Sequence, residues 1–117
     1  MKMTSLMAVA AGSLLALSAC NKSPAEKQAD VTEAKSDAAA EQTEAATDAQ
    51  AKAMDAQANV VEKEADTAPT QAAKDAKEAS ADALHDKADA TREAGDKQAD
   101  AMKKEGDAKS DAMKKQD

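Results

Sequence analysis

The chain has 117 residues, a formal net charge of −7, a single cysteine and no aromatic residue. Hydrophobic residues make up 42% of it, but alanine dominates, and beyond position 20 only seven residues carry a larger apolar side chain. Each of these contributes at most about 1.5–3 kcal/mol when fully buried, too little in sum to offset the conformational entropy of a globular fold. The composition therefore excludes a globular core and an enclosed catalytic pocket. The seven are Val31, Met54, Val60, Val61, Leu84, Met102 and Met113.

Residues 1–19 have the pattern of a secretory signal peptide. Lys2 forms a short basic region, residues 6–17 are mostly apolar, and small residues follow. The apolar run is interrupted by Gly12 and Ser13 and is shorter than the ~20 residues that span a bilayer as a helix. The sequence therefore predicts a removable signal rather than a membrane-spanning helix.

The signal ends in Leu17-Ser18-Ala19-Cys20, which resembles the lipobox of bacterial lipoproteins. The resemblance implies that the Cys20 thiol takes a diacylglyceryl group and that Cys20 becomes the N-terminus of the mature chain. Two or three acyl chains then give stable membrane anchoring. The alternative is an ordinary signal peptide in which Cys20 is simply an apolar residue.

The residue after the cysteine is Asn21 rather than aspartate, and the same resemblance then implies delivery to the periplasmic face of the outer membrane. Because Cys20 is the only cysteine, an internal disulfide and a multi-cysteine zinc site are excluded.

The mature chain is predicted to be helical. Residues 20–23 form the lipidated anchor and a short linker, followed by a capping Ser23, Pro24 at the first helical position and Glu26 at the third. The first helical segment covers 24–67. Pro69 lacks a backbone donor and disfavours helical geometry at the preceding residue, so a break is expected at 68–69.

A second helical segment covers 70–117, and the two segments are expected to meet at a kink or short break. Fully helical and extended, they would reach roughly 135–140 Å. Acidic residues precede lysines by four positions at several places, and each such pair stabilises an isolated helix by only about 0.2–0.5 kcal/mol. The fold class is therefore all-α or conditionally disordered, with one or two long solvated helices and no globular core. The pairs are Asp48–Lys52, Glu93–Lys97, Asp100–Lys104, Glu105–Lys109 and Asp111–Lys115.

Residues 73–116 contain degenerate 11-residue repeats, and the last two units share Gly, Asp, Ala, Met and Lys positions. Eleven residues in three turns favour slight right-handed supercoiling and keep one stripe in register. Small residues dominate this stripe, so it is expected to be a weak association face. Its members are Leu84, Ala88, Gly95, Ala99, Met102, Gly106, Ser110 and Met113.

On these repeats and this composition, residues 73–116 resemble the group 3 late embryogenesis abundant proteins. That resemblance implies a chain that is disordered in water, becomes helical on drying or at membranes, and protects membranes and proteins. The mature chain also resembles small alanine-rich outer-membrane lipoproteins, including the murein lipoprotein. It departs from the latter in lacking an aliphatic heptad seam and in ending Lys115-Gln116-Asp117 rather than in a wall-linked lysine.

No pattern predicts catalysis or a cofactor. The only histidine, His85, has Asp82, Asp86 and Asp89 near it in sequence, and these are expected to be hydrated carboxylates on a polar helix face. The acidic balance and the absence of stacking aromatics oppose nucleic-acid binding. No glycine-rich phosphate loop occurs, and no small-molecule substrate is predicted.

The leading functional hypothesis is a lipid-anchored envelope protein with a structural, spacer-like or stress-protective role and no enzymatic activity. The alternative is an interaction module, an accessory subunit whose helices order on binding an envelope partner, with weak self-association also open. A membrane-lying amphipathic helix ranks last, because such helices need a large apolar face.

Overall fold

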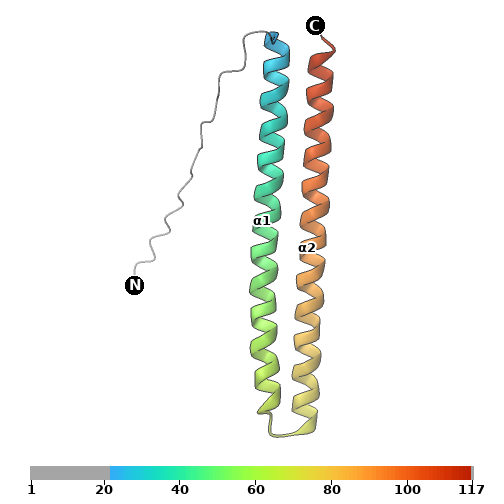
Figure 1. Ribbon diagram of the computed structural model, residues 1–117. Coiled ribbons are helices and arrows are strands. Elements are labelled where there is room, and N and C mark those ends of the chain that lie inside the picture. The colour runs from blue at the N-terminus through green and yellow to red at the C-terminus, as the bar shows by residue number, and fades with distance from the viewer. Residues whose placement is uncertain (1–21, 117) are drawn as a thin grey trace, which may run out of the picture.

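The computed structural model describes residues 22–116, which form an antiparallel helical hairpin (Figure 1). Helix α1 spans Pro24–Asp66 and helix α2 spans Gln71–Lys114. The end of α2 lies beside the beginning of α1, and no strand occurs in the described part. The expected all-α fold class without a globular core is confirmed. The predicted signal peptide, the lipobox-like residues 17–20 and Asn21 lie outside the described residues.

Helix α1 begins with a reciprocal cap. The Ser23 hydroxyl accepts a hydrogen bond from the Glu26 amide at 3.2 Å, and the Glu26 carboxylate accepts one from the Ser23 amide at 2.9 Å. Pro24 occupies the first helical position, where a missing amide donor costs nothing. The capping box expected at Ser23, Pro24 and Glu26 is present.

The connection between the helices reverses the chain direction. Thr67 is the C-cap of α1, and Thr70 caps α2 by accepting a hydrogen bond from the Ala73 amide at 3.2 Å. The sequence predicted a kink or short break at 68–69, and the structure has a break there that forms a hairpin turn. The helices have 43 and 44 residues, so the hairpin is about 65 Å long.

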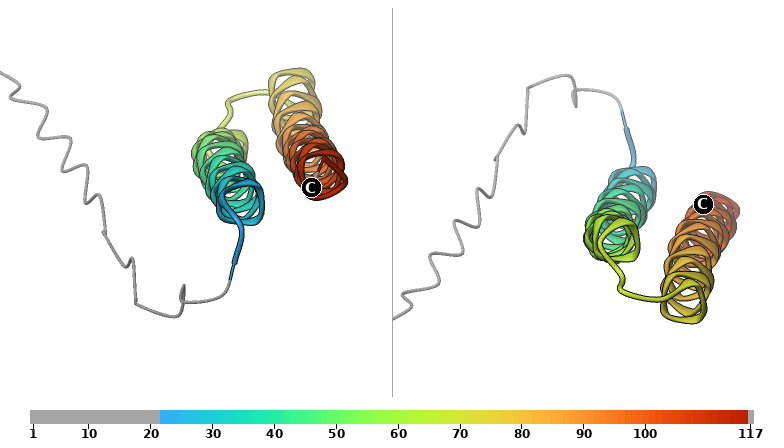
Figure 2. Two further views of the ribbon diagram at one scale, coloured as in Figure 1. Left: turned by 90° about the horizontal axis from the view of Figure 1, so that it is seen from above. Right: turned by 90° about the horizontal axis from the view of Figure 1, so that it is seen from below.

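The two helices form one layer, as the end-on views in Figure 2 show. Every buried hydrophobic residue along their contact is an alanine. Side chains this small let two helix backbones approach closely, but they bury little apolar area. We call this contact the seam. Its buried residues are Ala29, Ala40, Ala51, Ala58 and Ala65 from α1, and Ala81, Ala88, Gly95, Ala99, Gly106 and Ser110 from α2.

Candidate functional site

The seam is the most organised feature of the described chain, and its layers repeat every 11 residues. Three threonine hydroxyls lie near methionine sulfurs of the opposite helix, at 3.7, 3.6 and 3.9 Å. From one pair to the next, the residue number rises by 11 in α1 and falls by 11 in α2. The pairs are Thr32 with Met113, Thr43 with Met102, and Thr91 with Met54.

Two glycines of α2 lie between these layers, each facing a hydroxyl residue of α1. A β-carbon placed on Gly95 would lie 2.6 Å from the Thr47 β-carbon. One placed on Gly106 would lie 2.5 Å from the Ser36 hydroxyl oxygen. Both positions therefore require glycine because the other helix occupies the space that a side chain would need.

The spacing of the buried positions changes along each helix. In α1 it is 11 residues over 29–51 and then 7 over 51–65. In α2 it is 7 over 81–95, and beyond 95 it alternates between 4 and 7, so that the pattern repeats every 11 residues over 95–110. A 7-residue spacing favours left-handed supercoiling and an 11-residue spacing slight right-handed supercoiling. Because the helices are antiparallel, like spacings face each other. We call 51–95 the turn half, and 24–50 with 96–114 the open half.

Charged side chains flank the seam in the turn half. The His85 ring places Nδ1 2.9 Å from an Asp55 oxygen and Nε2 3.3 Å from a Glu62 oxygen. Arg92 donates to the other Asp55 oxygen at 2.5 Å. Hydrogen bonds to Asp55 and then Glu62 raise the pKa of His85, and the bonds from Arg92 and His85 lower the pKa of Asp55.

Ion pairs also join the helices in the open half. Lys103 lies 3.1 Å from Glu44, and Lys114 lies 3.8 Å from Glu33. Ser110 donates a hydrogen bond to Glu33 at 3.2 Å. The bond to Glu44 raises the pKa of Lys103. These contacts fix the end of α2 beside the beginning of α1, close in sequence to Cys20.

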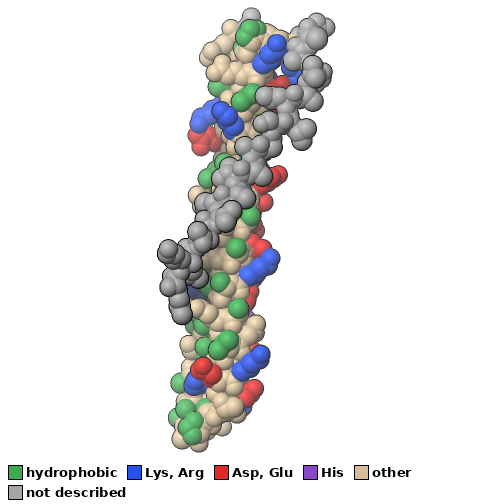
Figure 3. All heavy atoms as spheres, turned by 90° about the vertical axis from the view of Figure 1, so that its left-hand side faces the viewer, with side chains coloured by type: hydrophobic (Ala, Val, Ile, Leu, Met, Phe, Trp, Pro, Cys, Tyr) green, Lys and Arg blue, Asp and Glu red, His purple; other side chains and the backbone are tan. Residues whose placement is uncertain are grey.

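The outer surfaces are mainly polar. Figure 3 shows charged side chains of both signs scattered among small apolar ones on one face of the hairpin. The main exception in the described residues is a shallow apolar depression near the turn, where Val60 is 56% exposed. It is lined by Ala56, Gln57, Val60, Val61 and Leu84.

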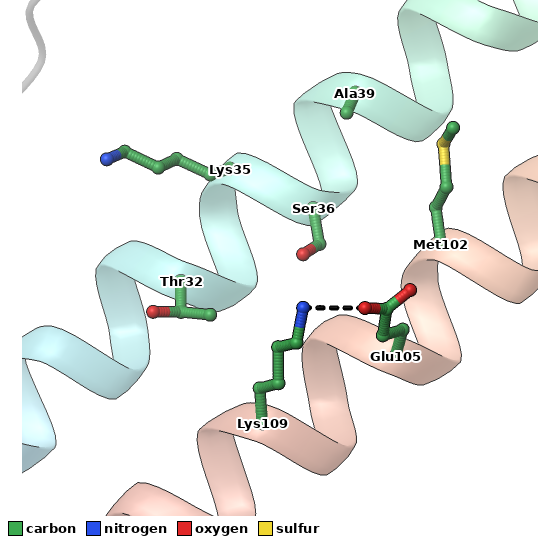
Figure 4. A pocket seen from close by; sticks show the side chains of 7 residues that line it. All are labelled: Thr32, Lys35, Ser36, Ala39, Met102, Glu105 and Lys109. Atoms are coloured by element: carbon green, nitrogen blue, oxygen red, sulfur yellow. Dashed lines mark hydrogen bonds and ion pairs between the residues drawn. The ribbon is translucent and has the colours of Figure 1, made fainter.

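A second hollow lies in the open half, between α1 and α2 (Figure 4). Met102 stands at its edge, and Ser36 points from α1 into the space between the helices. An ion pair between Lys109 and Glu105, 2.6 Å long, borders it on the α2 side. The hollow is open to solvent and lies against the methionine layer.

The sequence-derived stripe of α2 is the face that packs against α1. It was expected to be a weak association face, and its partner is the other half of the same chain. The matching pattern in α1 was missed, although the signal was present in alanines at 29, 40 and 51 and in Thr32 and Thr43.

The local charge predictions had a mixed outcome. Three of the five acid-first pairs are ion pairs in the structure, namely Asp48–Lys52, Glu93–Lys97 and Glu105–Lys109. His85 was expected among the aspartates of its own helix. Its partners come instead from α1, because residue 85 lies beside the seam.

The described residues contain no group of three or more histidine, cysteine or acidic side chains placed to hold a metal ion. Within 22–116, neither helix has an apolar stretch long enough to cross a membrane. No protein-family model matches the sequence, and no curated protein or solved structure matches it significantly.

Proposed function

We propose that this protein is a lipid-anchored cell-envelope protein whose helical hairpin serves as a spacer or protective element without catalysis. The observation that carries the proposal is the position of the open end. Helix α1 begins at Pro24, four residues after Cys20, and Lys114 at the end of α2 lies 4.0 Å from Asp30. Lipid on Cys20 would hold both helix ends at the membrane, with the turn about 65 Å away.

The composition of the hairpin supports a structural role. Its buried residues are alanine, glycine and serine, and its exposed faces carry charges of both signs. Such a surface stays hydrated, and between residues 22 and 116 it offers no enclosed cavity in which a reaction could exclude water. Because Asn21 rather than aspartate follows Cys20, we infer that the protein is anchored in the outer membrane and faces the periplasm.

The alternative proposal is an accessory subunit that binds an envelope protein. The seam of α2 is covered by α1, so such a partner would contact an outer face. The apolar depression around Val60 and Leu84 favours this reading, because Val60 is 56% exposed. A partner would then be captured by the full chain and lost with Val60→Asp.

Labelling with radioactive palmitate in a Gram-negative host tests the anchor. The full chain should incorporate label and fractionate with membranes, and Cys20→Ser should abolish both. Lys22→Gln is the matched control, because it lies outside residues 17–20 and should label normally. Unlabelled wild-type protein, or equal labelling of Cys20→Ser, would overturn the anchoring.

A shortened hairpin separates the spacer role from the protective role. Deleting 37–47 together with 95–105 removes one 11-residue unit from each helix, preserves the pairing of Ser36 with Gly106, and shortens the hairpin by about 16 Å. A spacer should lose its contribution to envelope integrity in proportion to length. A protective element should still support survival of osmotic and drying stress. Failure of the full-length gene to change either phenotype in a deletion strain would contradict both roles.

A further inference from the structure

All three methionines of the described chain lie along the seam, and each is half-buried rather than enclosed. Met54 belongs to α1, whereas Met102 and Met113 belong to α2. The described residues contain no cysteine, tryptophan or tyrosine. These thioethers are therefore the most readily oxidised groups of the hairpin, and solvent reaches them.

Each sulfur faces a threonine hydroxyl of the other helix. The hydroxyls of Thr32, Thr43 and Thr91 also lie 2.8–2.9 Å from the carbonyl oxygen four residues earlier in their own helix. A thioether is a weak acceptor, so the single proton of each hydroxyl goes to that carbonyl. A stronger acceptor at the sulfur position would compete for this proton.

Access is clearest at Met102. The hollow between the helices is lined by Met102, Thr32, Ser36 and Ala39, and it opens to solvent (Figure 4). A small oxidant can therefore approach the sulfur without separation of the helices.

We propose that Met54, Met102 and Met113 form a ladder of oxidation sites whose sulfoxides are held by the facing threonine hydroxyls. The oxidant class is a peroxide. The sulfur lone pair attacks one peroxide oxygen, an S–O bond forms and the O–O bond breaks. Sulfur loses two electrons, and the other oxygen takes the proton and leaves as water when the oxidant is hydrogen peroxide.

The hairpin in this way consumes oxidant while remaining folded. A sulfoxide normally disrupts an apolar contact, because its polar oxygen has no partner there. Here Thr32, Thr43 and Thr91 supply one donor per site. This inference deepens the proposed protective role. It rests on that role only for the location, the cell envelope, in which the protein would encounter the oxidant.

The test treats the purified full chain with hydrogen peroxide. Peptide mass spectrometry should find one added oxygen on each of the three methionines, at rates within about tenfold of those in urea. Circular dichroism should show that oxidised wild type keeps its helicity and its melting midpoint within a few degrees. The combined Thr32→Val, Thr43→Val and Thr91→Val variant should lose roughly 10 °C on oxidation.

The matched control is Thr47→Val, because Thr47 lies on the seam and bonds to carbonyls of its own helix but faces Gly95 rather than a sulfur. It should respond to oxidation as wild type does. Should the triple variant fail to fold, Thr43→Val alone tests the Met102 site.

Two outcomes would overturn the ladder. In the first, oxidation lowers the helicity of wild type and of the triple threonine variant equally. In the second, the three methionine sulfurs stay unreactive under conditions that oxidise free methionine. Neither depends on Cys20. The palmitate labelling can therefore contradict the anchor while the oxidation results support the ladder, and the oxidation results can contradict the ladder while the labelling supports the anchor.

Discussion

The two halves of the hairpin use the same backbone geometry but different side chains. In the turn half the buried residues are alanines and Gly95, with half-buried Leu84 beside them, and the charges of Asp55, His85 and Arg92 connect α1 to α2. In the open half glycine and serine replace larger residues, as at Gly106 facing Ser36. The turn half therefore joins its helices through a cluster of charges around Asp55, whereas the open half has separate ion pairs, such as Lys103 with Glu44, beside Met102 and Met113.

The difference in spacing explains why the halves join without a break. Each helix changes from one spacing to the other near the same level, at Ala51 in α1 and Gly95 in α2. Thr47 faces Gly95 and Met54 faces Thr91, so the two changes lie opposite each other. The supercoil can reverse there because both helices reverse it together.

The largest expected effect comes from breaking the periodicity of the open half. Deleting five residues, 43–47, rotates the preceding part of α1 by about 140° and places Lys35 and Gln42 on the seam. We expect a loss of about 2–4 kcal/mol of unfolding free energy, because Met102 and Met113 lose their packing. Amide exchange over 24–42 should rise to the rate of an unfolded chain, whereas the turn half stays protected.

The paired removal of 37–47 and 95–105 is the control for this deletion. It removes more residues but keeps the seam in register, so its helical content per residue should match wild type. If amide exchange in the open half were slower in the five-residue deletion than in the paired deletion, the 11-residue register would not be the feature that stabilises the open half.

An intermediate effect is expected at the glycines. Gly106→Ala and Gly95→Ala each add a methyl group where the opposite helix lies, which costs about 1–3 kcal/mol. The better helix propensity of alanine offsets about 1 kcal/mol of this. Thermal unfolding should show a lower midpoint, and Gly106→Ala combined with Ser36→Gly should recover most of it. A midpoint above wild type for either single variant would mean that the helices are not in close contact there.

The smallest effect concerns pH and the turn half. The pKa of His85 is raised from 6.5, so its stabilisation is complete below about 6.5 and is lost as pH rises through the higher folded value. The pKa of Asp55 is lowered from 3.8, so its stabilisation is present above about 3.8 and is lost as pH falls through the lower folded value. The turn half should be most stable between these limits.

Melting midpoints from pH 3 to pH 9 test this window. His85→Gln should flatten the profile on its alkaline side, and Glu93→Gln, which affects only an exposed pair with Lys97, should leave that side unchanged. An identical alkaline slope in wild type and His85→Gln would show that the contacts to Asp55 and Glu62 do not stabilise the hairpin.

Much of the local structure was predictable because it depends on neighbouring residues. Ser23, Pro24 and Glu26 specify the start of α1 through hydrogen bonds within one turn. Pro69 specifies the break because it restricts its own backbone and that of Ala68. The seam face of α2 was also predictable, since it repeats small residues and methionine at a fixed spacing.

The partners across the seam were not predictable in the same way. The link from His85 to Asp55 joins residues 30 positions apart, and that from Thr32 to Met113 joins residues 81 positions apart. Their meeting depends on whether the chain continues past Pro69 or turns back. Propensity does not distinguish these outcomes, because both keep the same helices.

Composition and local backbone chemistry make residues 22–116 helical and acidic, leave them without a globular core and break the helix at Pro69, so the sequence predicts these properties. The reversal at the break and the covering of the α2 stripe by α1 depend on packing between the helices. The reason is that alanine and glycine provide little attraction at a distance. Their fit becomes decisive only when two complementary faces are brought into register.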